Sequence, residues 1–168
     1  ARSLILCLVR PYTMQRFSIS VFLIGGVLLA GPLYSQRMST NQALEIDHIA
    51  LHVRDLQRSA DFYHMILGLE RLPDPFKDDR HAFFRVGPRT ELHLNAGAQS
   101  TPGQDIDVHF ALRTPALLPF IEFLKEKHIK YFSTKREEGV ITNRPDGIKQ
   151  IYFQDPDGYW VEVNDSRL

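Results

Sequence analysis

The chain has 168 residues, enough for one ordinary domain but not for two large ones. Hydrophobic residues make up 43% and charged residues 24%, and the formal net charge is zero, which is typical of a soluble globular protein without the basic surplus of a nucleic-acid-binding protein. The single cysteine, Cys7, excludes both a disulfide within the chain and a cysteine-based zinc site.

The first residues differ in character from the rest. A basic residue, Arg16, precedes an apolar run from Phe17 to Ala30, and Gly31-Pro32 and Ser35-Gln36 follow. This layout predicts a secretory signal peptide within residues 1–36, with export to the periplasm or the outside. Residues 1–13 then precede the true start at Met14. The alternative is an uncleaved membrane anchor, because the apolar stretch is near the lower length limit for a spanning helix. Polar residues 37–43 read as a linker.

Residues 44–165 read as one domain in which a strand–helix–strands pattern occurs twice. The same spacing separates His48 from His109 and Phe62 from Phe123, which indicates an internal repeat. Asp55 is a suitable helix cap, and Gly68 stands where a helix would end. The strands expected in the first unit are Ile46–Val53, Glu70–Leu72, Ala82–Val86 and Thr90–Asn95, with a helix at Leu56–Leu67. In the second unit they are Ile106–Leu112, Lys130–Phe132, Lys149–Phe153 and Tyr159–Asn164, with a helix within Thr114–His128 starting near Pro119.

Four of these strands place metal-binding side chains on one face. Because side chains alternate along a strand, residues two apart lie on the same side. Each strand has an aliphatic face, and the opposite faces carry His48, Glu91 with His93, His109, and Glu162. Two imidazoles and two carboxylates suit a divalent first-row ion. Such an ion can polarise a carbonyl, and a carboxylate such as Glu91 or Glu162 can act as general base.

The sequence resembles the vicinal oxygen chelate superfamily, which includes glyoxalase I, extradiol dioxygenases and bleomycin resistance proteins. The resemblance rests on IDHIALHVRDLQRSADFYHMILGLE at Ile46–Glu70, ELHLNAG at Glu91–Gly97, DVHFAL at Asp107–Leu112 and FQDPDGYWVEV at Phe153–Val163. It implies an α+β fold in which two βαβββ modules form a curved mixed sheet around a metal. It also implies His48, Glu91, His109 and Glu162 as the metal ligands, with His93 as the alternative to Glu91.

The resemblance further implies a divalent Ni, Zn, Mn, Fe or Co ion and a small-molecule substrate with vicinal oxygens. A glyoxalase-like lyase or isomerase is the expected activity. The alternatives are a ring-cleaving dioxygenase and a non-catalytic drug-binding protein. A homodimer is expected by the same resemblance, with the site within one chain or across the dimer. His52 is expected near the site or facing solvent, and Arg85 and Tyr152 are candidate substrate contacts.

Overall fold

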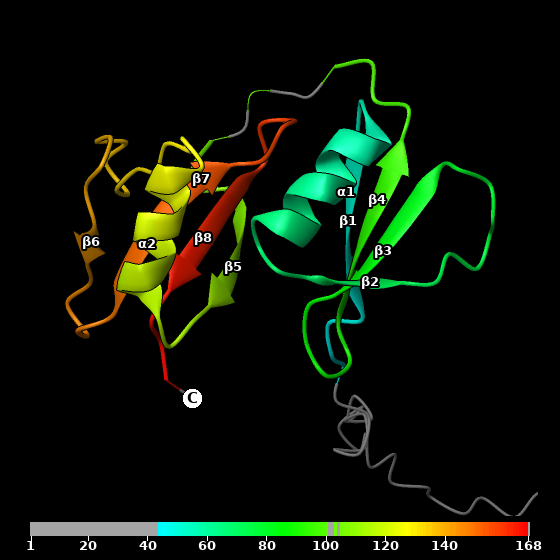
Figure 1. Cartoon of the computed structure of the whole chain (residues 1–168). Coiled ribbons are helices and arrows are strands. Elements are labelled where there is room, and N and C mark those ends of the chain that lie inside the picture. The colour runs from blue at the N-terminus through cyan, green and yellow to red at the C-terminus, as the bar shows by residue number, and fades with distance from the viewer. Residues whose placement is uncertain (1–43, 101–102, 104, 168) are drawn as a thin grey trace, which may run out of the picture. The chain divides into compact units, whose positions relative to one another are not determined.

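The computed structural model describes residues 44–100, 103 and 105–167 (Figure 1). The predicted leader and linker, residues 1–43, lie outside the described residues, and the leader therefore stays a prediction. In chain order the elements are β1 (His48–Val53), α1 (Leu56–Met65), β2 (Glu70–Leu72), β3 (His81–Arg85), β4 (Glu91–Ala96), β5 (His109–Arg113), α2 (Leu117–Glu126), β6 (Thr142–Asn143), β7 (Lys149–Gln154) and β8 (Trp160–Asn164). None of the helices described is long and apolar enough to cross a membrane.

The strands form two sheets of the same topology, which confirms the predicted pair of βαβββ modules. The first sheet has the order β1-β4-β3-β2 and the second the order β5-β8-β7-β6. In each sheet the first strand of the module pairs in parallel with the last, and the other pairings are antiparallel. Consequently β1 and β5 are edge strands, and each lies beside the strand that carries the other candidate ligands of its module.

Helix α1 begins and packs as its sequence predicts. Asp55 caps it, because its carboxylate accepts a 3.0 Å hydrogen bond from the backbone nitrogen of Arg58. Ala60 and Tyr63 are buried against the first sheet, where Leu92 and Leu94 are fully buried. Gly68 follows the helix with a φ of 66°, a conformation that glycine adopts without steric cost.

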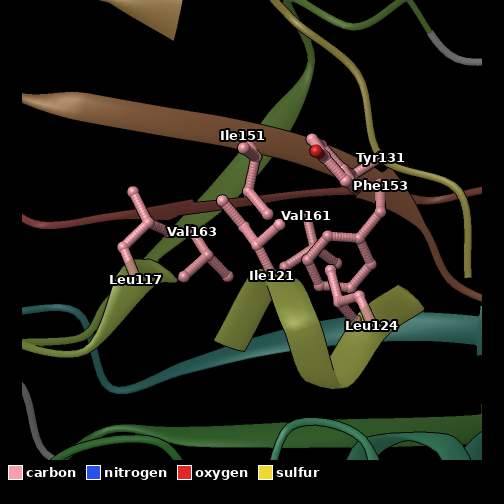
Figure 2. Packing of buried hydrophobic residues seen from close by; sticks show 8 residues of the cluster. All are labelled: Leu117, Ile121, Leu124, Tyr131, Ile151, Phe153, Val161 and Val163. Carbon is pink, nitrogen blue, oxygen red and sulfur yellow. The ribbon is translucent and has the colours of Figure 1, made fainter. Parts of the chain in front are cut away.

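Helix α2 covers the aliphatic face of the second sheet. It starts at Leu117 without a side-chain cap, and Pro119 is its third residue, where the missing N–H leaves no helical hydrogen bond unmade. Figure 2 shows the side chains of α2 packed against those of the neighbouring strands. The buried cluster consists of Leu117, Ile121, Leu124, Tyr131, Ile151, Phe153, Val161 and Val163.

The two modules share core contacts through α1. Phe62, Ile66 and Leu67 pack against the buried cluster of the second module, and Phe110 of β5 packs against Tyr63, with ring centroids 6.5 Å apart. The same α1 helix therefore contributes to both hydrophobic cores.

Two expected elements differ from the structure. The strand expected at Lys130–Phe132 is not formed: Phe132 makes only isolated bridges, to Glu138 and Tyr152, and the fourth strand of the sheet is the short β6 instead. The strand expected from Ile106 begins at His109, because a turn in which Val108 N–H donates to the Asp105 carbonyl precedes it. Neither change removes a candidate ligand from its strand.

Candidate metal centre

The candidate ligands lie on the sheet faces opposite the two helices. On β1, Leu51 and Val53 are buried, whereas His48 and His52 are exposed on the other side. On β4, Glu91 and His93 share the face opposite the buried Leu92 and Leu94. The alternation that the sequence predicts is therefore present in the first module, where the aliphatic face packs against α1 and the polar face is accessible. On β8 of the second module both faces are buried.

In the first module three candidate side chains lie together. The His48 ring stacks on the His93 ring, with centroids 4.2 Å apart and an interplanar angle of 9°. His93 Nε2 donates to Glu91 Oε2 at 3.0 Å. His48 Nδ1 donates to Asp47 Oδ2 at 2.8 Å, which leaves His48 Nε2 without the proton.

In the second module His109 lies beside Glu162. His109 Nδ1 donates to the Ile106 carbonyl at 2.7 Å, and Nε2 lies 3.4 Å from Glu162 Oε2. A carbonyl oxygen can only accept, so this bond fixes the tautomer and leaves Nε2 as an electron-pair donor. Glu162, which is 5% exposed, lies on a central strand of the sheet.

Donors from neighbouring residues fix both oxygens of Glu162. Tyr152 Oη donates to Oε2 and Asn164 Nδ2 donates to Oε1, each at 2.6 Å, and Gln150 Nε2 donates to Tyr152 Oη at 2.7 Å. Burial and the adjacent Glu162 carboxylate raise the pKa of Tyr152 well above its ordinary value, so the phenol stays a donor. Gln150 was not predicted as a neighbour of the candidate ligands. Because it lies two residues before Tyr152 on the same strand, alternation would place both side chains on one face.

The chemistry of these residues fits a divalent ion. Two ligand atoms each about 2.1 Å from one ion in adjacent positions are about 3 Å apart, close to the His109–Glu162 separation. A metal-bound histidine normally donates its other ring nitrogen to a carbonyl or carboxylate, and both His48 and His109 do so. These hydrogen bonds orient Nε2 of each ring for coordination.

The structure does not bring the two pairs together. Among the described residues, no group of three or more His, Cys, Asp or Glu side chains could hold a metal ion. Each module of this chain therefore presents a pair of candidate ligands, and the assignment of His48, Glu91, His109 and Glu162 to a single site stays a prediction.

Strand register bears on the choice between Glu91 and His93. Glu91 is the Cα partner of His48, and His93 is the partner of Ala50. In the second module, Glu162 is the partner of Ala111 rather than of His109. If the repeat equates His48 with His109, the position equivalent to Glu162 is His93. The strand register therefore supports His93 as the alternative ligand, which alternation in the sequence could not do.

A cavity of about 730 Å³ opens beside the first pair of candidate ligands. Arg85, predicted as a substrate contact, lines it, as do His48, Glu91 and His93. His81 also lines the cavity, and so does Phe76 from the β2–β3 loop. No periodic pattern marks a loop residue, so Phe76 could not be predicted.

The fold and the sequence together define the family. Residues 45–163 match the Glyoxalase/Bleomycin resistance protein/Dioxygenase superfamily, and the chain belongs to it. This confirms the resemblance, which rested on the motifs around His48, Glu91, His109 and Glu162.

Particular relatives span several activities. The chain is 31% identical to the uncharacterized protein YwbC of Bacillus subtilis, over 71% of this chain and 96% of YwbC. It is 29% identical to a lactoylglutathione lyase of Arabidopsis thaliana over 69% of this chain, but spans only 42% of that enzyme's length. Among solved structures, the oxidase ChaP-H1 is similar with a TM-score of 0.62 and 25% identity, over 74% of this chain and 98% of ChaP-H1.

Proposed function

We propose that the protein is a metal-dependent enzyme acting on a small substrate with two neighbouring oxygens, as a glyoxalase-like lyase or isomerase. The observation that carries this proposal is that His48 and His109, at equivalent places in the two modules, each donate Nδ1 to an oxygen acceptor. His109 lies beside Glu162, and His48 stacks on His93, which bonds Glu91. Similarity to a lactoylglutathione lyase supports the reaction class.

The ligands in this proposal are His48, Glu91, His109 and Glu162, with His93 as the alternative to Glu91. Ni, Zn, Mn, Fe or Co would suit this donor set, and the bound ion would polarise a substrate oxygen. The two carboxylates have different roles open to them. Glu162 accepts hydrogen bonds from Tyr152 and Asn164. Glu91 is half-exposed, and within the described part of the chain its carboxylate accepts from His93, so Glu91 has the freedom to accept a substrate proton.

We also propose that a second copy of the chain completes the site. Each module carries half of the ligand set, and among the described strands β1 pairs with β4 and β5 with β8, which leaves one edge of each free for a neighbour. In a twofold dimer, His48 and Glu91 of one copy would meet His109 and Glu162 of the other, giving two equivalent sites.

An oxygen-dependent reaction is the second candidate, because the oxidase ChaP-H1 shares the fold at 25% identity. Oxygen consumption during turnover of a catechol would favour it over the lyase or isomerase. A bound metal without turnover on any dicarbonyl or catechol would favour a binding protein on the same scaffold.

Elemental analysis of the purified full chain tests the proposal, beside a His48→Ala/Glu162→Ala variant. The control is His52→Ala, which removes an exposed imidazole from the same strand. We expect near-stoichiometric first-row metal in the wild type and in the control, and none in the double variant. A folded wild type that takes up no metal even after reconstitution would contradict the proposal.

A further inference from the structure

The cavity beside His48 has proline and aromatic side chains in its wall. Its lining includes Pro73, Pro75, Phe76 and Phe83 next to the candidate ligands His48 and His93. Its volume of about 730 Å³ lies within the range of small-molecule sites, which are mostly apolar with a few polar groups. All of these residues belong to the first module.

A series of ring contacts runs from Phe76 to the candidate ligands His93 and His48. The Phe76 ring lies 4.7 Å from the His81 ring and 6.1 Å from the Phe83 ring. Phe83 meets His93 edge to face at 4.6 Å, and His93 stacks on His48. A flat group that contacts Phe76 and Phe83 would therefore also adjoin the imidazoles of the half-site.

The β2–β3 loop holds Phe76 in place although its side chain is exposed. Phe76 is 63% exposed, and its ring contacts those of His81 and Phe83. The Asp74 carboxylate accepts from Phe76 N at 2.8 Å, and Lys77 and Asp79 both adopt a left-handed φ of 54°. Residues other than glycine rarely adopt this conformation, so the backbone of the loop beside Phe76 is strained.

The charged groups of the cavity are already paired. Arg85 Nε donates to Glu70 at 2.9 Å, and His81 Nδ1 donates to Asp78 at 2.8 Å. His93 bonds Glu91, and His48 bonds Asp47. Since each cationic or imidazole side chain in the described lining has a carboxylate partner, the described part of the wall offers no unpaired cation to an anionic substrate, and Glu91 adds a carboxylate to it.

We propose that this cavity is the subsite for a flat aromatic group of the substrate, packed against the rings of Phe76 and Phe83. The substrate class is an uncharged aromatic compound with two neighbouring oxygens. The position of those oxygens near His48 rests on the proposed metal function, but the aromatic subsite itself does not need the metal.

Binding of 2-naphthol to the metal-free full chain, followed by its fluorescence anisotropy, tests the subsite. This probe has a single hydroxyl and cannot chelate. Phe76→Ala should weaken binding about fivefold or more, because the probe loses both an aromatic ring contact and the apolar area that the ring buries. Phe76→Tyr should stay within about twofold, since it keeps the ring, and so should the control Leu118→Ala, an exposed residue of α2.

Two results would overturn the subsite: no binding by the folded wild type, or equal binding by Phe76→Ala and wild type. A parallel titration with 2,3-dihydroxynaphthalene separates the two proposals. Tighter binding of this diol after metal loading supports both. If metal loading has no effect while 2-naphthol binding still depends on Phe76, the metal function fails and the aromatic subsite stands.

Discussion

Tyr63 on α1 donates a 2.7 Å hydrogen bond from Oη to Asp155 Oδ2, on the turn that leads into β8, and so joins the two modules inside the protein. The other oxygen of Asp155 accepts from the backbone nitrogens of Asp157 and Tyr159. Burial raises the pKa of the Asp155 carboxyl. Burial, followed by the charge of Asp155, also raises the pKa of Tyr63, so the phenol remains protonated and donates.

Replacing Tyr63 with phenylalanine should destabilise the protein by about 1–3 kcal/mol, because Asp155 then loses its buried donor. Urea unfolding of the full chain measures the change. The matched control is Tyr159→Phe, which removes an exposed hydrogen bond to the His52 carbonyl and should cost less than about 1 kcal/mol. Equal losses in the two variants would contradict the role assigned to the buried bond.

Asp157 should make the protein sensitive to acid. Burial alone would raise its pKa, but hydrogen bonds from Ser59 Oγ and from the backbone and side chain of Arg54 hold the pKa below the ordinary value. A carboxyl with a lowered folded pKa stabilises the protein above its unfolded pKa of about 3.9, and this contribution is lost as the pH falls through the folded value. Asp155, whose pKa is raised, acts in the opposite sense: its contribution is present below the unfolded pKa and is lost as the pH rises through the folded value.

An Asp157→Asn variant should therefore be less stable at pH 7, by about 1–2 kcal/mol, and the deficit should shrink below about pH 4. Unfolding curves at pH 7 and pH 3 measure this difference. Asp146→Asn, at an exposed turn, is the control and should show little change at either pH. A stability deficit of the same size at both pH values would contradict the proposed dependence of stability on the ionisation of Asp157.

The ligand choice in the first module gives a paired test. Glu91→Gln should weaken metal binding more than about tenfold, because the site loses a carboxylate that neutralises the ion. His93→Gln should weaken it less, because the glutamine amide can still donate to Glu91. Competition with a chromophoric chelator measures both affinities. The reverse order would make His93 the ligand, as the register equivalence with Glu162 suggests.

Tyr152→Phe should lower metal affinity about 10- to 100-fold, the usual effect of removing a residue that positions a ligand. The phenol bonds Glu162 Oε2 at 2.6 Å and so fixes the carboxylate beside His109. Tyr131→Phe, which removes a hydrogen bond to the Gly139 carbonyl away from the candidate ligands, is the control. Unchanged affinity in Tyr152→Phe would show that Glu162 is held without it.

Much of the fold followed from the sequence because its signals are local. The Asp55 cap, the burial stripe of α1 and the alternation on β1 and β4 each depend on residues a few positions apart. The strand expected at Lys130–Phe132 was wrong because its partners, Glu138 and Tyr152, are determined by tertiary pairing. Likewise, alternation places Glu91 and His93 on the same face but cannot give the register that distinguishes them.

The separation of the two ligand pairs could not be predicted from the sequence. Periodicity fixes which face each ligand occupies, and His48 and His109 occupy equivalent places. How the modules pack depends on α1, whose side chains Phe62, Ile66 and Leu67 enter the second core. That packing is set by tertiary contacts, which no local pattern in the chain encodes.

Subunit complementation tests most directly the central claim that two copies of the chain share each metal site. Full chains of His48→Ala and His109→Ala are each expected to bind no stoichiometric metal. In a shared site, a mixed dimer has one site with both changes and one with neither. After unfolding and refolding an equal mixture, about one quarter of the wild-type metal content should return. A mixture that stays metal-free, although mixed dimers are shown to form, would contradict a site shared between copies.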